Sequence, residues 1–351
     1  MNELEQVIEH HRRFWTKGAG PLLCLYQHKP LSKMELPLVD GTPLTDDMYL
    51  TPRILDPSLL LDLEESPPKP RLQPDRPGGV TGDVLIIRRP MTKMCWVEAI
   101  MGCPVRMQAG AGSIYSEPCL KGPDGLDKIP TPYINGWLNL LVDYTRGLVE
   151  KADNRYYVSL PLMRGTIDLV AALLGYGKMY FSFYDQPRQL LKLIERCTET
   201  FVKVVDALYT VIPKMADGRV SYYSLWAPGA VVRTQCDASA AISANTYEKF
   251  FFPYEIEICS SFNYSIMHLH SGYLHTIDIF LKSLYPTAIQ ISLDTGSTPL
   301  TTKDLIPVFK KVLERKPLII QGRCNQRELS QLLQALPSDG LCILAELTDM
   351  G

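Results

Sequence analysis

Two alternating patterns of hydrophobic and polar positions organise the chain from about residue 155 onward. Short runs rich in β-branched and aromatic residues indicate strands, and longer runs with apolar residues at three- and four-residue steps indicate helices. The predicted strands are residues 155–161, 220–229, 264–272, 288–296, 317–324 and 340–347. The predicted helices are residues 166–177, 185–211, 245–262, 273–284, 302–315 and 325–336. Strands that alternate with helices in this way predict parallel βαβ units.

Two earlier strand candidates, residues 21–27 and 83–89, bring the strand count close to eight. That count favours a closed (β/α)8 barrel of the TIM type over an open doubly wound sheet. No predicted strand is followed by a G-x-G-x-x-G or Walker-type loop, so there is no case for a dinucleotide or triphosphate site. We therefore predict an α/β fold with one barrel domain over residues 1–351. Residues 30–82 are proline-rich and show no sustained period, which predicts a long irregular excursion over the barrel.

Composition narrows the class of protein. Hydrophobic residues make up 46% of the chain and charged residues 21%, with a formal net charge of -2, so nothing predicts binding to nucleic acid or to an anionic membrane. No run approaches a membrane span, and the charged N-terminus lacks the apolar core of a signal peptide. The nine cysteines are scattered, odd in number and without a Cys-x-x-Cys pair, which indicates reduced thiols. We expect a cytoplasmic protein that acts on a small molecule; a homodimer is left open.

The predicted strand ends carry the candidate chemistry, because active sites of such barrels lie at the carboxyl ends of the strands. These positions, taken together, supply histidine, cysteine, arginine and carboxylate side chains from distant parts of the sequence. They are Trp226, Arg233, Cys236, Asp237, His268, His270, Asp294, Arg323, Cys324, Asn325 and Glu346, to which Arg164 is a further candidate.

Within this set, His268 and His270 stand out by their His-x-His spacing at the end of a predicted strand. Residues i and i+2 of a strand point to the same face, and neutral imidazoles are favoured metal ligands, so the pair predicts a metal site. Glu346 would complete a two-His, one-carboxylate set, whereas a thiolate from Cys324 or Cys236 would make a softer site that suits zinc.

Each candidate also has a structural interpretation. The two histidines could hydrogen-bond to neighbouring carbonyls and order a loop. Asp294, in an Asp-Thr-Gly sequence, could form an Asx turn, and a buried arginine beside an aspartate is often a structural ion pair. Cys324 could simply fill space in the core.

The order of several motifs resembles the uroporphyrinogen decarboxylase superfamily. Residues 236–258 resemble its aspartate-containing loop and the helical motif that follows, and residues 168–199 resemble its long helical stretch. The HLHSGYL run at 268–274 stands where the family places its histidine motif, and residues 318–325 match its penultimate strand. The likeness covers roughly residues 95–346 and implies a (β/α)8 barrel.

The superfamily includes decarboxylases that use neither metal nor cofactor, and methylcobamide:thiol methyltransferases such as those that serve coenzyme M. This chain lacks the arginine-rich R-Q-A-G-R signature of the decarboxylases; residues 105–112 are only superficially similar to it. The methyltransferases bind zinc through a His-x-Cys pair and a distant cysteine, and take the methyl group from a corrinoid carried by a partner protein. His268 matches the family's histidine, His270 replaces its cysteine, and the distant cysteine falls close to Glu346.

Three functional hypotheses follow from the residues and the resemblance. The first is a corrinoid-linked methyltransferase that uses zinc or another divalent metal, with His268, His270 and either Glu346 or Cys324 as ligands. Asp237, Arg233 and Arg323 would then position the substrate. The second is a metal-free decarboxylase or lyase, in which Asp237 or Asp294 stabilises a developing cation and Arg323 holds a carboxylate.

The third hypothesis is a non-catalytic protein that binds a corrinoid or another tetrapyrrole. Three aromatic residues predicted near the barrel mouth would contact such a flat ligand, although their spacing fits core packing equally well. They are Tyr222, Tyr223 and Trp226.

Overall fold

The structure is a computed structural model that describes residues 1–27, 36, 38–43, 45–62, 80–108, 110, 112–294 and 300–348. Its centre is a six-stranded parallel sheet in the order β1–β15–β14–β13–β12–β11. The strands are β1 (Leu22–Gln27), β11 (Val231–Gln235), β12 (Tyr264–His270), β13 (Ala288–Leu293), β14 (Leu318–Cys324) and β15 (Leu341–Leu347). The first and last of them pair directly, with Leu22 opposite Cys342.

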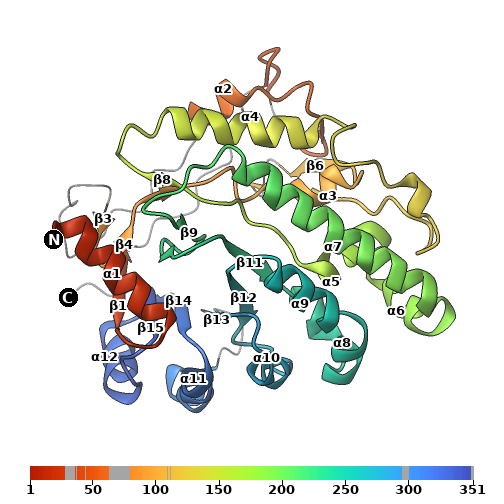
Figure 1. Cartoon of the computed structure of the whole chain (residues 1–351). Helices are drawn as coiled ribbons and strands as arrows, with labels where there is room; N and C mark the ends of the chain where they lie inside the picture. The colour runs from red at the N-terminus through yellow and green to blue at the C-terminus, as the bar shows by residue number, and fades with distance from the viewer. Residues whose placement is uncertain are drawn as a thin grey trace.

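Helices connect these strands and cover the outer face of the sheet, as βαβ units require (Figure 1). The later helices form an arc outside the strands: α8 (Ala244–Phe250), α9 (Phe252–Ser260), α10 (Ile277–Lys282), α11 (Thr302–Arg315) and α12 (Gln326–Ala335). The outward side chains of β12, Met267 and Leu269, belong to the same large buried cluster as Phe280 of α10 and Phe309 of α11. The predicted alternation of strands and helices is therefore confirmed over this half of the chain.

Closure into an eight-stranded barrel is not seen among the described residues. The predicted strand at 83–89 is divided into β4 (Val84–Leu85) and β5 (Ile87–Arg88), and the one at 155–161 is reduced to β8 (Tyr157–Val158). β5 and β8 pair in parallel with each other, in a ladder separate from the six-stranded sheet. The structure thus shows a mixed α/β fold with a six-stranded parallel sheet.

The strand predicted at 220–229 is wrong. This segment folds into a short antiparallel hairpin, β9 (Arg219–Val220) and β10 (Trp226–Ala227). Ser224 reverses the chain between them, with a left-handed φ of 66°, and the amide of Ser221 donates to the carbonyl of Leu225 over 2.7 Å. The sheet strand is instead β11, in a segment for which no strand is predicted from the sequence.

A further described part of the chain packs beside the sheet (Figure 1). It contains α5 (Thr166–Leu174), α6 (Tyr176–Asp185), α7 (Pro187–Tyr209), α4 (Trp137–Glu150), α3 (Trp96–Ile100) and the 3-10 turns η1 (Leu126–Lys128) and η2 (Asp237–Ala241). A small antiparallel sheet consists of β2 (Tyr49–Leu50), β6 (Val105–Gln108) and β7 (Ser113–Ser116).

Part of the predicted excursion is described. It includes β2, α2 (Pro57–Asp62) and β3 (Val80–Thr81), the last of which pairs with β4. α2 lies against α4, where the Tyr144 hydroxyl donates to the carbonyl of Leu60 over 3.2 Å. Leu50, Leu55 and Leu60 are buried in the main cluster. The proline-rich residues 66–79 lie outside the described residues.

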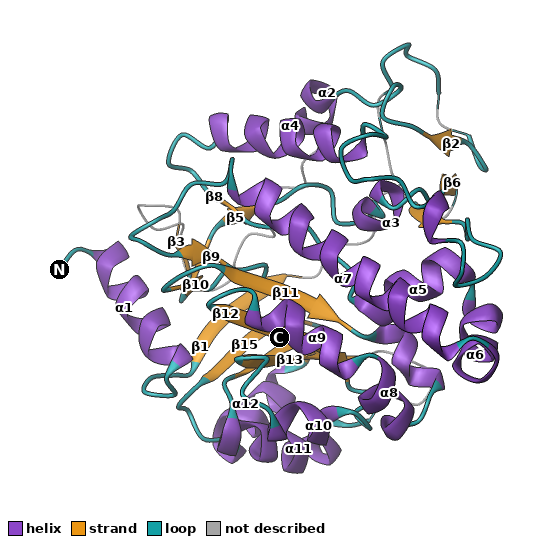
Figure 2. Ribbon diagram, turned by 45° about the vertical axis from the view of Figure 1, so that its right-hand side comes forward, coloured by secondary structure: helices purple, strands orange, loops and turns teal. Residues whose placement is uncertain are grey.

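Helix α1 (Glu3–Trp15) covers the amino ends of the strands. Phe14 and Trp15 at its end are buried with the first residues of β1, β11 and β13, and the Trp15 ring lies 4.9 Å from the ring of Tyr264 at the start of β12. In Figures 1 and 2, α1 lies on one side of the sheet and α5 and α6 on the opposite side. One end of the sheet is therefore closed by a helix, and the other end holds the residues at the strand termini.

Candidate functional site

The side chains inside the curved sheet change from apolar to polar along the strands. Because successive strand residues alternate between faces, Ile266, His268 and His270 of β12 share the inner face. Ile266 lies in the apolar cluster under α1, whereas the two histidines follow toward the carboxyl end. The inner face of β13 repeats this order with Ala288, Gln290 and Ser292, each opposite its β12 counterpart. The candidate site is therefore built on the inner face at the carboxyl ends.

His268 is held by a buried polar network. Its Nδ1 hydrogen-bonds to Oε1 of Gln290, which also accepts from the Tyr223 hydroxyl over 2.7 Å. Arg233 donates from Nε to that hydroxyl over 3.1 Å. An amide oxygen only accepts, so this contact assigns the ring proton to Nδ1 of His268 and leaves a lone pair on Nε2. Burial, followed by the charge of Arg233, holds the pKa of His268 well below its ordinary value, so the ring is neutral.

His270 is oriented in the same way by a carboxylate. Its Nδ1 lies 2.6 Å from Oδ1 of Asp294, and Oδ2 of Asp294 accepts from the amide of Gly272 over 2.8 Å. Because the carboxylate accepts, a ring proton is again assigned to Nδ1, and in the neutral ring Nε2 carries the lone pair. A carboxylate behind a histidine ring is the usual support of a metal-binding imidazole.

Asp237 approaches both histidines from the neighbouring strand. It follows β11, and its Oδ2 accepts from Nε2 of Gln235 over 2.7 Å. Asp168 on α5 fixes the backbone here, since its carboxylate accepts from the amides of Asp237 (3.3 Å) and Ala238 (2.7 Å). The second oxygen of Asp237, Oδ1, is buried and has no hydrogen-bond partner. Buried oxygens without a partner are uncommon, and a cation, a proton or a water molecule would supply the missing one.

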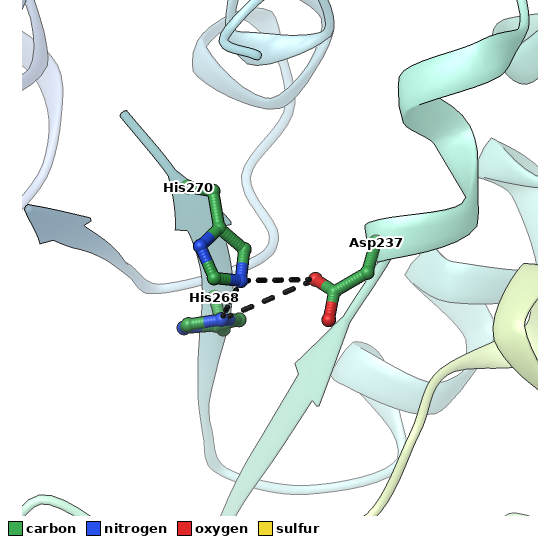
Figure 3. Close-up of side chains that lie close together, drawn as sticks. All are labelled: Asp237, His268 and His270. Atoms are coloured by element: carbon green, nitrogen blue, oxygen red, sulfur yellow. Dashed lines mark hydrogen bonds and ion pairs between the residues drawn. The ribbon is translucent and has the colours of Figure 1, made fainter. Parts of the chain in front are cut away.

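These three side chains converge on one point (Figure 3). The Nε2 atoms of His268 and His270 lie 3.2 Å apart, and Oδ1 of Asp237 lies 4.0 Å from the first and 3.7 Å from the second. With both ring protons on Nδ1, all three facing atoms are acceptors. Three converging acceptors repel one another unless a positive charge lies between them.

The arrangement fits a divalent metal ion. Ligand atoms about 2.0–2.2 Å from one ion in tetrahedral geometry lie about 3.3–3.6 Å apart. The observed separations of 3.2, 3.7 and 4.0 Å come close to this spacing. Asp237, His268 and His270 bring their ligand atoms within 4.8 Å of one another. Within the described part of the chain, no other group of three or more His, Cys, Asp or Glu side chains does so. Two imidazoles and one carboxylate are a common donor set for zinc and for ferrous iron.

Asp168 and Asp237 lie close enough for the charge of one to affect the pKa of the other. Burial raises the pKa of Asp237, while His270 and Arg233 oppose that rise. Burial and the nearby charge of Asp237 raise the pKa of Asp168 to about 6. Both carboxyls therefore lie in a site that disfavours additional negative charge and favours a bound cation.

A cavity of about 380 Å³ opens beside Asp237. Its wall includes Arg164, Asp168 and Tyr176, together with Gln235 and Asp237. Arg164 pairs with the buried carboxylate of Glu98 over 3.1 Å, and its side chain is 39% exposed. The volume is that of a small-molecule site, at the low end of the usual range.

The structure brings together some of the predicted residues and separates others. His268, His270 and Asp237 meet, with Asp294, Arg233 and Tyr223 behind them. Glu346 and Arg323 instead pair with each other over 3.2 Å, on β15 and β14, outside the converging group. Cys324 belongs to the cluster between the sheet and the outer helices, since its strand position places it on the face opposite to Arg323. Cys236 is buried in the same cluster.

Trp226 lies at the closed end of the sheet rather than at the mouth. It is fully buried against α1, where its amide donates to Nδ1 of His11 over 3.0 Å and Arg12 covers its ring. The hairpin explains this position. Trp226 precedes β11, so it lies near the amino end of that strand and not at the carboxyl end, where the site is.

Three contributors were not identified from the sequence: Gln235, Gln290 and Asp168. A signal was present for two of them. Gln290 is a polar residue within an otherwise apolar buried strand, and Asp168 is the acidic residue of the apolar helix α5. Both are fully or almost fully buried, and buried polar side chains require partners.

Comparison with known proteins identifies the fold. No protein-family model matches the sequence, and no curated protein matches it. Among solved structures, a methyltransferase from Methanosarcina mazei superposes with a TM-score of 0.63 over 98% of this chain and 94% of its own, at 13% identity. This chain therefore shares the fold of a methyltransferase, as the resemblance predicts.

A B12-independent methionine synthase from Shewanella sp. W3-18-1, solved with selenomethionine, gives a TM-score of 0.33 over 60% of each chain at 12% identity. That likeness is too weak to carry an argument. Among the described helices, none combines the length and apolar character that crossing a membrane requires.

Proposed function

We propose that the protein is a methyltransferase that activates a small nucleophile at a metal site formed by His268, His270 and Asp237. The observation that carries this proposal is the convergence of three acceptor atoms, one of them a buried carboxylate oxygen without a partner. Asp237 replaces Glu346 and Cys324 as the third ligand in this proposal. β11 is the neighbour of β12, whereas β15, which carries Glu346, is three strands away, and Cys324 of β14 lies in the cluster between the sheet and the outer helices.

The donor set indicates the kind of chemistry. A divalent ion held by two imidazoles and one carboxylate would act as a Lewis acid and lower the pKa of a substrate thiol or hydroxyl. Zinc fits this set, as do other divalent metals. Gln290 and Asp294 hold the two rings so that both Nε2 atoms face the same point, and Gln235 holds Asp237.

The cavity beside Asp237 is the proposed entry for the nucleophile. Arg164 and Tyr176 line it, and Asp237 belongs both to its wall and to the ligand group. A substrate seated there would approach the site from the side of Asp237. The methyl donor in this proposal is a corrinoid carried by a partner protein, as in the methyltransferase branch that the sequence resembles.

We also propose that β5 and β8 complete a closed barrel. In the chain they come between β1 and β11, which are the two edges of the six-stranded sheet. Supporting contacts exist on both sides: the amide of Asp83 donates to the carbonyl of Leu23 over 3.1 Å, and Arg233 donates to the carbonyl of Met163 over 3.3 Å.

A metal-free carboxy-lyase is the second candidate. It is favoured by the presence of Arg164 in the same cavity wall as Asp168 and Asp237. A guanidinium could hold a substrate carboxylate there while a carboxyl group stabilises a developing cation.

Metal content tests the first proposal. We expect anaerobically purified protein to hold close to one zinc or other divalent ion per chain, measured by mass spectrometry, and the His268→Ala/His270→Ala double variant to lose it. His275→Ala is the matched control, since His275 is exposed in the segment that follows and should leave the metal in place. Absence of metal after zinc is supplied, or its retention in the double variant, would contradict the metal site.

Methyl transfer is then tested directly with methylcobalamin as the donor and a panel of small thiols as acceptors. We expect the absorbance of methylcobalamin to decay in the wild type and the control variant and to persist in the double variant. Release of CO2 from a small acid by metal-free protein, without any methyl transfer, would instead support the lyase.

A further inference from the structure

Two cysteines lie close together beside the cavity. The Sγ atoms of Cys103 and Cys119 are 3.8 Å apart. Cys103 precedes β6 and Cys119 follows β7, and these strands pair with Val105 opposite Ser116. The amide of Glu117 extends the pairing toward the cysteines by donating to the carbonyl of Pro104 over 2.9 Å. The open end of this hairpin therefore holds the two thiols in contact.

The two thiols differ in access and in acidity. All nine cysteines lie in the described part of the chain, and Cys119 is the one among them that is not buried. Cys103 is 3% exposed. The contact with the Cys103 sulfur lowers the pKa of Cys119, while the same contact and burial raise the pKa of Cys103. Cys119 is thus the more accessible thiol and the one with more thiolate character.

Both cysteines are also attached to the end of α5. The amide of Cys119 donates to the carbonyl of Leu173 over 3.1 Å, and the sulfur of Cys103 lies 3.7 Å from the carbonyl oxygen of Ala172. Ala172 lines the cavity, as does Pro118 next to Cys119. A change in the distance between the two sulfurs would therefore move residues of the cavity wall.

We propose that Cys103 and Cys119 are a thiol–disulfide exchange site that reacts with small disulfides such as oxidised glutathione. The thiolate of Cys119 attacks one sulfur of the small disulfide, the S–S bond breaks, and the first small thiol leaves with the proton that Cys119 gave up. Cys103 then attacks the sulfur of Cys119 in the mixed disulfide, and the second small thiol leaves with the proton of Cys103. In balance, one small disulfide is reduced to two thiols and the two cysteines are oxidised to one disulfide.

Oxidation of this pair changes the cavity wall. A disulfide requires sulfur atoms at about 2.05 Å, so the two thiols have to approach each other from their present 3.8 Å. The hairpin end and the last turn of α5 then shift relative to each other, with Pro118 and Ala172 between them and the cavity. This inference does not depend on the proposed methyl transfer, because it concerns different residues and a different reaction.

The experiment uses the reduced full-length protein and glutathione buffers of increasing oxidation. We expect the count of reactive thiols, measured after unfolding, to fall from nine to seven, and peptide mapping to join Cys103 to Cys119. Added reductant should restore all nine. In the Cys103→Ser variant, which lacks the second thiol, we expect one glutathione to remain attached to Cys119.

Cys119→Ser and Cys95→Ser complete the set. Cys119→Ser should neither lose two thiols nor gain glutathione. Cys95→Ser is the matched control, a buried cysteine of the same region whose thiol donates to the carbonyl of Ile114, and it should behave as the wild type. A wild-type protein that keeps all nine thiols, retains a stable adduct at Cys119 or joins other cysteines would overturn the proposal. Hydrogen exchange at residues 171–176 that is unchanged by the disulfide would overturn its link to the cavity.

Discussion

Histidines lie at both ends of the sheet, with His11 and His268 buried and His270 partly buried, and their ring nitrogens have different partners. At the closed end, His11 of α1 is fully buried, and both of its ring nitrogens meet backbone groups: Nε2 meets the carbonyl of Asp83 at 2.6 Å and Nδ1 the amide of Trp226 at 3.0 Å. At the open end, His268 and His270 each donate from Nδ1 to a side-chain oxygen, and each directs Nε2 at other acceptors. Burial alone therefore does not distinguish a structural histidine from a candidate ligand.

What distinguishes them is the partner of the second ring nitrogen. The His11 ring donates at one nitrogen and accepts at the other, so it joins α1 to the hairpin and to the segment before β4 without any further group. The rings at the mouth have one nitrogen each that lacks a donor, and the carboxylate that faces them adds a third acceptor. The ring nitrogens at the closed end all have partners within the protein, whereas the three acceptor atoms at the open end are arranged as a bound cation would need.

The largest expected effect is a difference in unfolding free energy between variants of His11 and of His270. Replacement of His11 by Ala leaves a buried amide and a buried carbonyl unpaired and opens a cavity, which should lower the free energy of unfolding by about 3–5 kcal/mol. His270→Ala, measured without metal, should cost no more than about 1 kcal/mol, because it removes one of three mutually repelling acceptors. Denaturant titrations of the two metal-free variants test the contrast. Equal losses would mean that the mouth histidines are structural as well.

The pH dependence of stability gives the next contrast. Burial lowers the pKa of His11 from 6.5 to about 4, so the folded protein keeps this ring neutral. The stability that neutral His11 supplies is complete above pH 6.5 and is lost as the pH falls toward 4, by about 3 kcal/mol in total. The difference between wild type and His11→Gln isolates this contribution from other groups. A difference in unfolding free energy that stays constant from pH 7.5 to 4 would refute it.

A smaller effect is expected from the carboxylate behind His270. Asp294→Asn keeps the shape of the side chain but weakens the contact that orients the ring and sets its proton. We expect metal affinity to fall by about 10- to 100-fold, the usual cost of losing such a support, which is about 1.4–2.7 kcal/mol. Competition with a coloured chelator measures it. An unchanged affinity would show that Asp294 serves the loop at Gly272 rather than the metal.

The smallest effects are expected at the residues that the sequence suggested as the third ligand. Glu346→Gln removes a half-exposed pair with Arg323, worth about 0–1 kcal/mol, and should change metal affinity by less than about threefold. Cys324→Ser should likewise leave metal affinity unchanged. Asp237→Asn, run in parallel, should lower it strongly. A strong loss of metal affinity in Glu346→Gln or Cys324→Ser, with little loss in Asp237→Asn, would instead make Glu346 or Cys324 the third ligand.

Much of the fold could be predicted from the sequence, because it depends on local patterns. The alternation of strand and helix periods located five of the six sheet strands, and the period of two along β12 placed His268 and His270 on one face. The strand β11 was missed, since its five residues VVRTQ are short and follow an aromatic run with a similar pattern. That run forms a hairpin because Ser224 takes a left-handed conformation. This conformation is uncommon for serine, and the pattern of hydrophobic residues does not predict it.

The third member of the site could not be chosen from the sequence for a different reason. Asp237 and Glu346 both follow or end predicted strands, and spacing along the chain does not say which strand lies next to β12. The order of strands in the sheet decides it, and β11 is the neighbour. The supports Gln290 and Asp168 depend in the same way on contacts between strands and helices that are far apart in sequence.

The pairing of β1 with β15 has a consequence for how the chain assembles. Leu22 and Cys342 are opposite each other, so this ladder joins residues from near the two ends of the described chain. During synthesis β1 emerges first and β15 last among the sheet strands, and contacts so distant in sequence form slowly. Strands β11 to β14, by contrast, pair in the order in which they leave the ribosome. We expect β12, which carries His268 and His270, to pair with its neighbours before β15 has been synthesised. Until then β1 has an unpaired strand edge, which chaperones could bind.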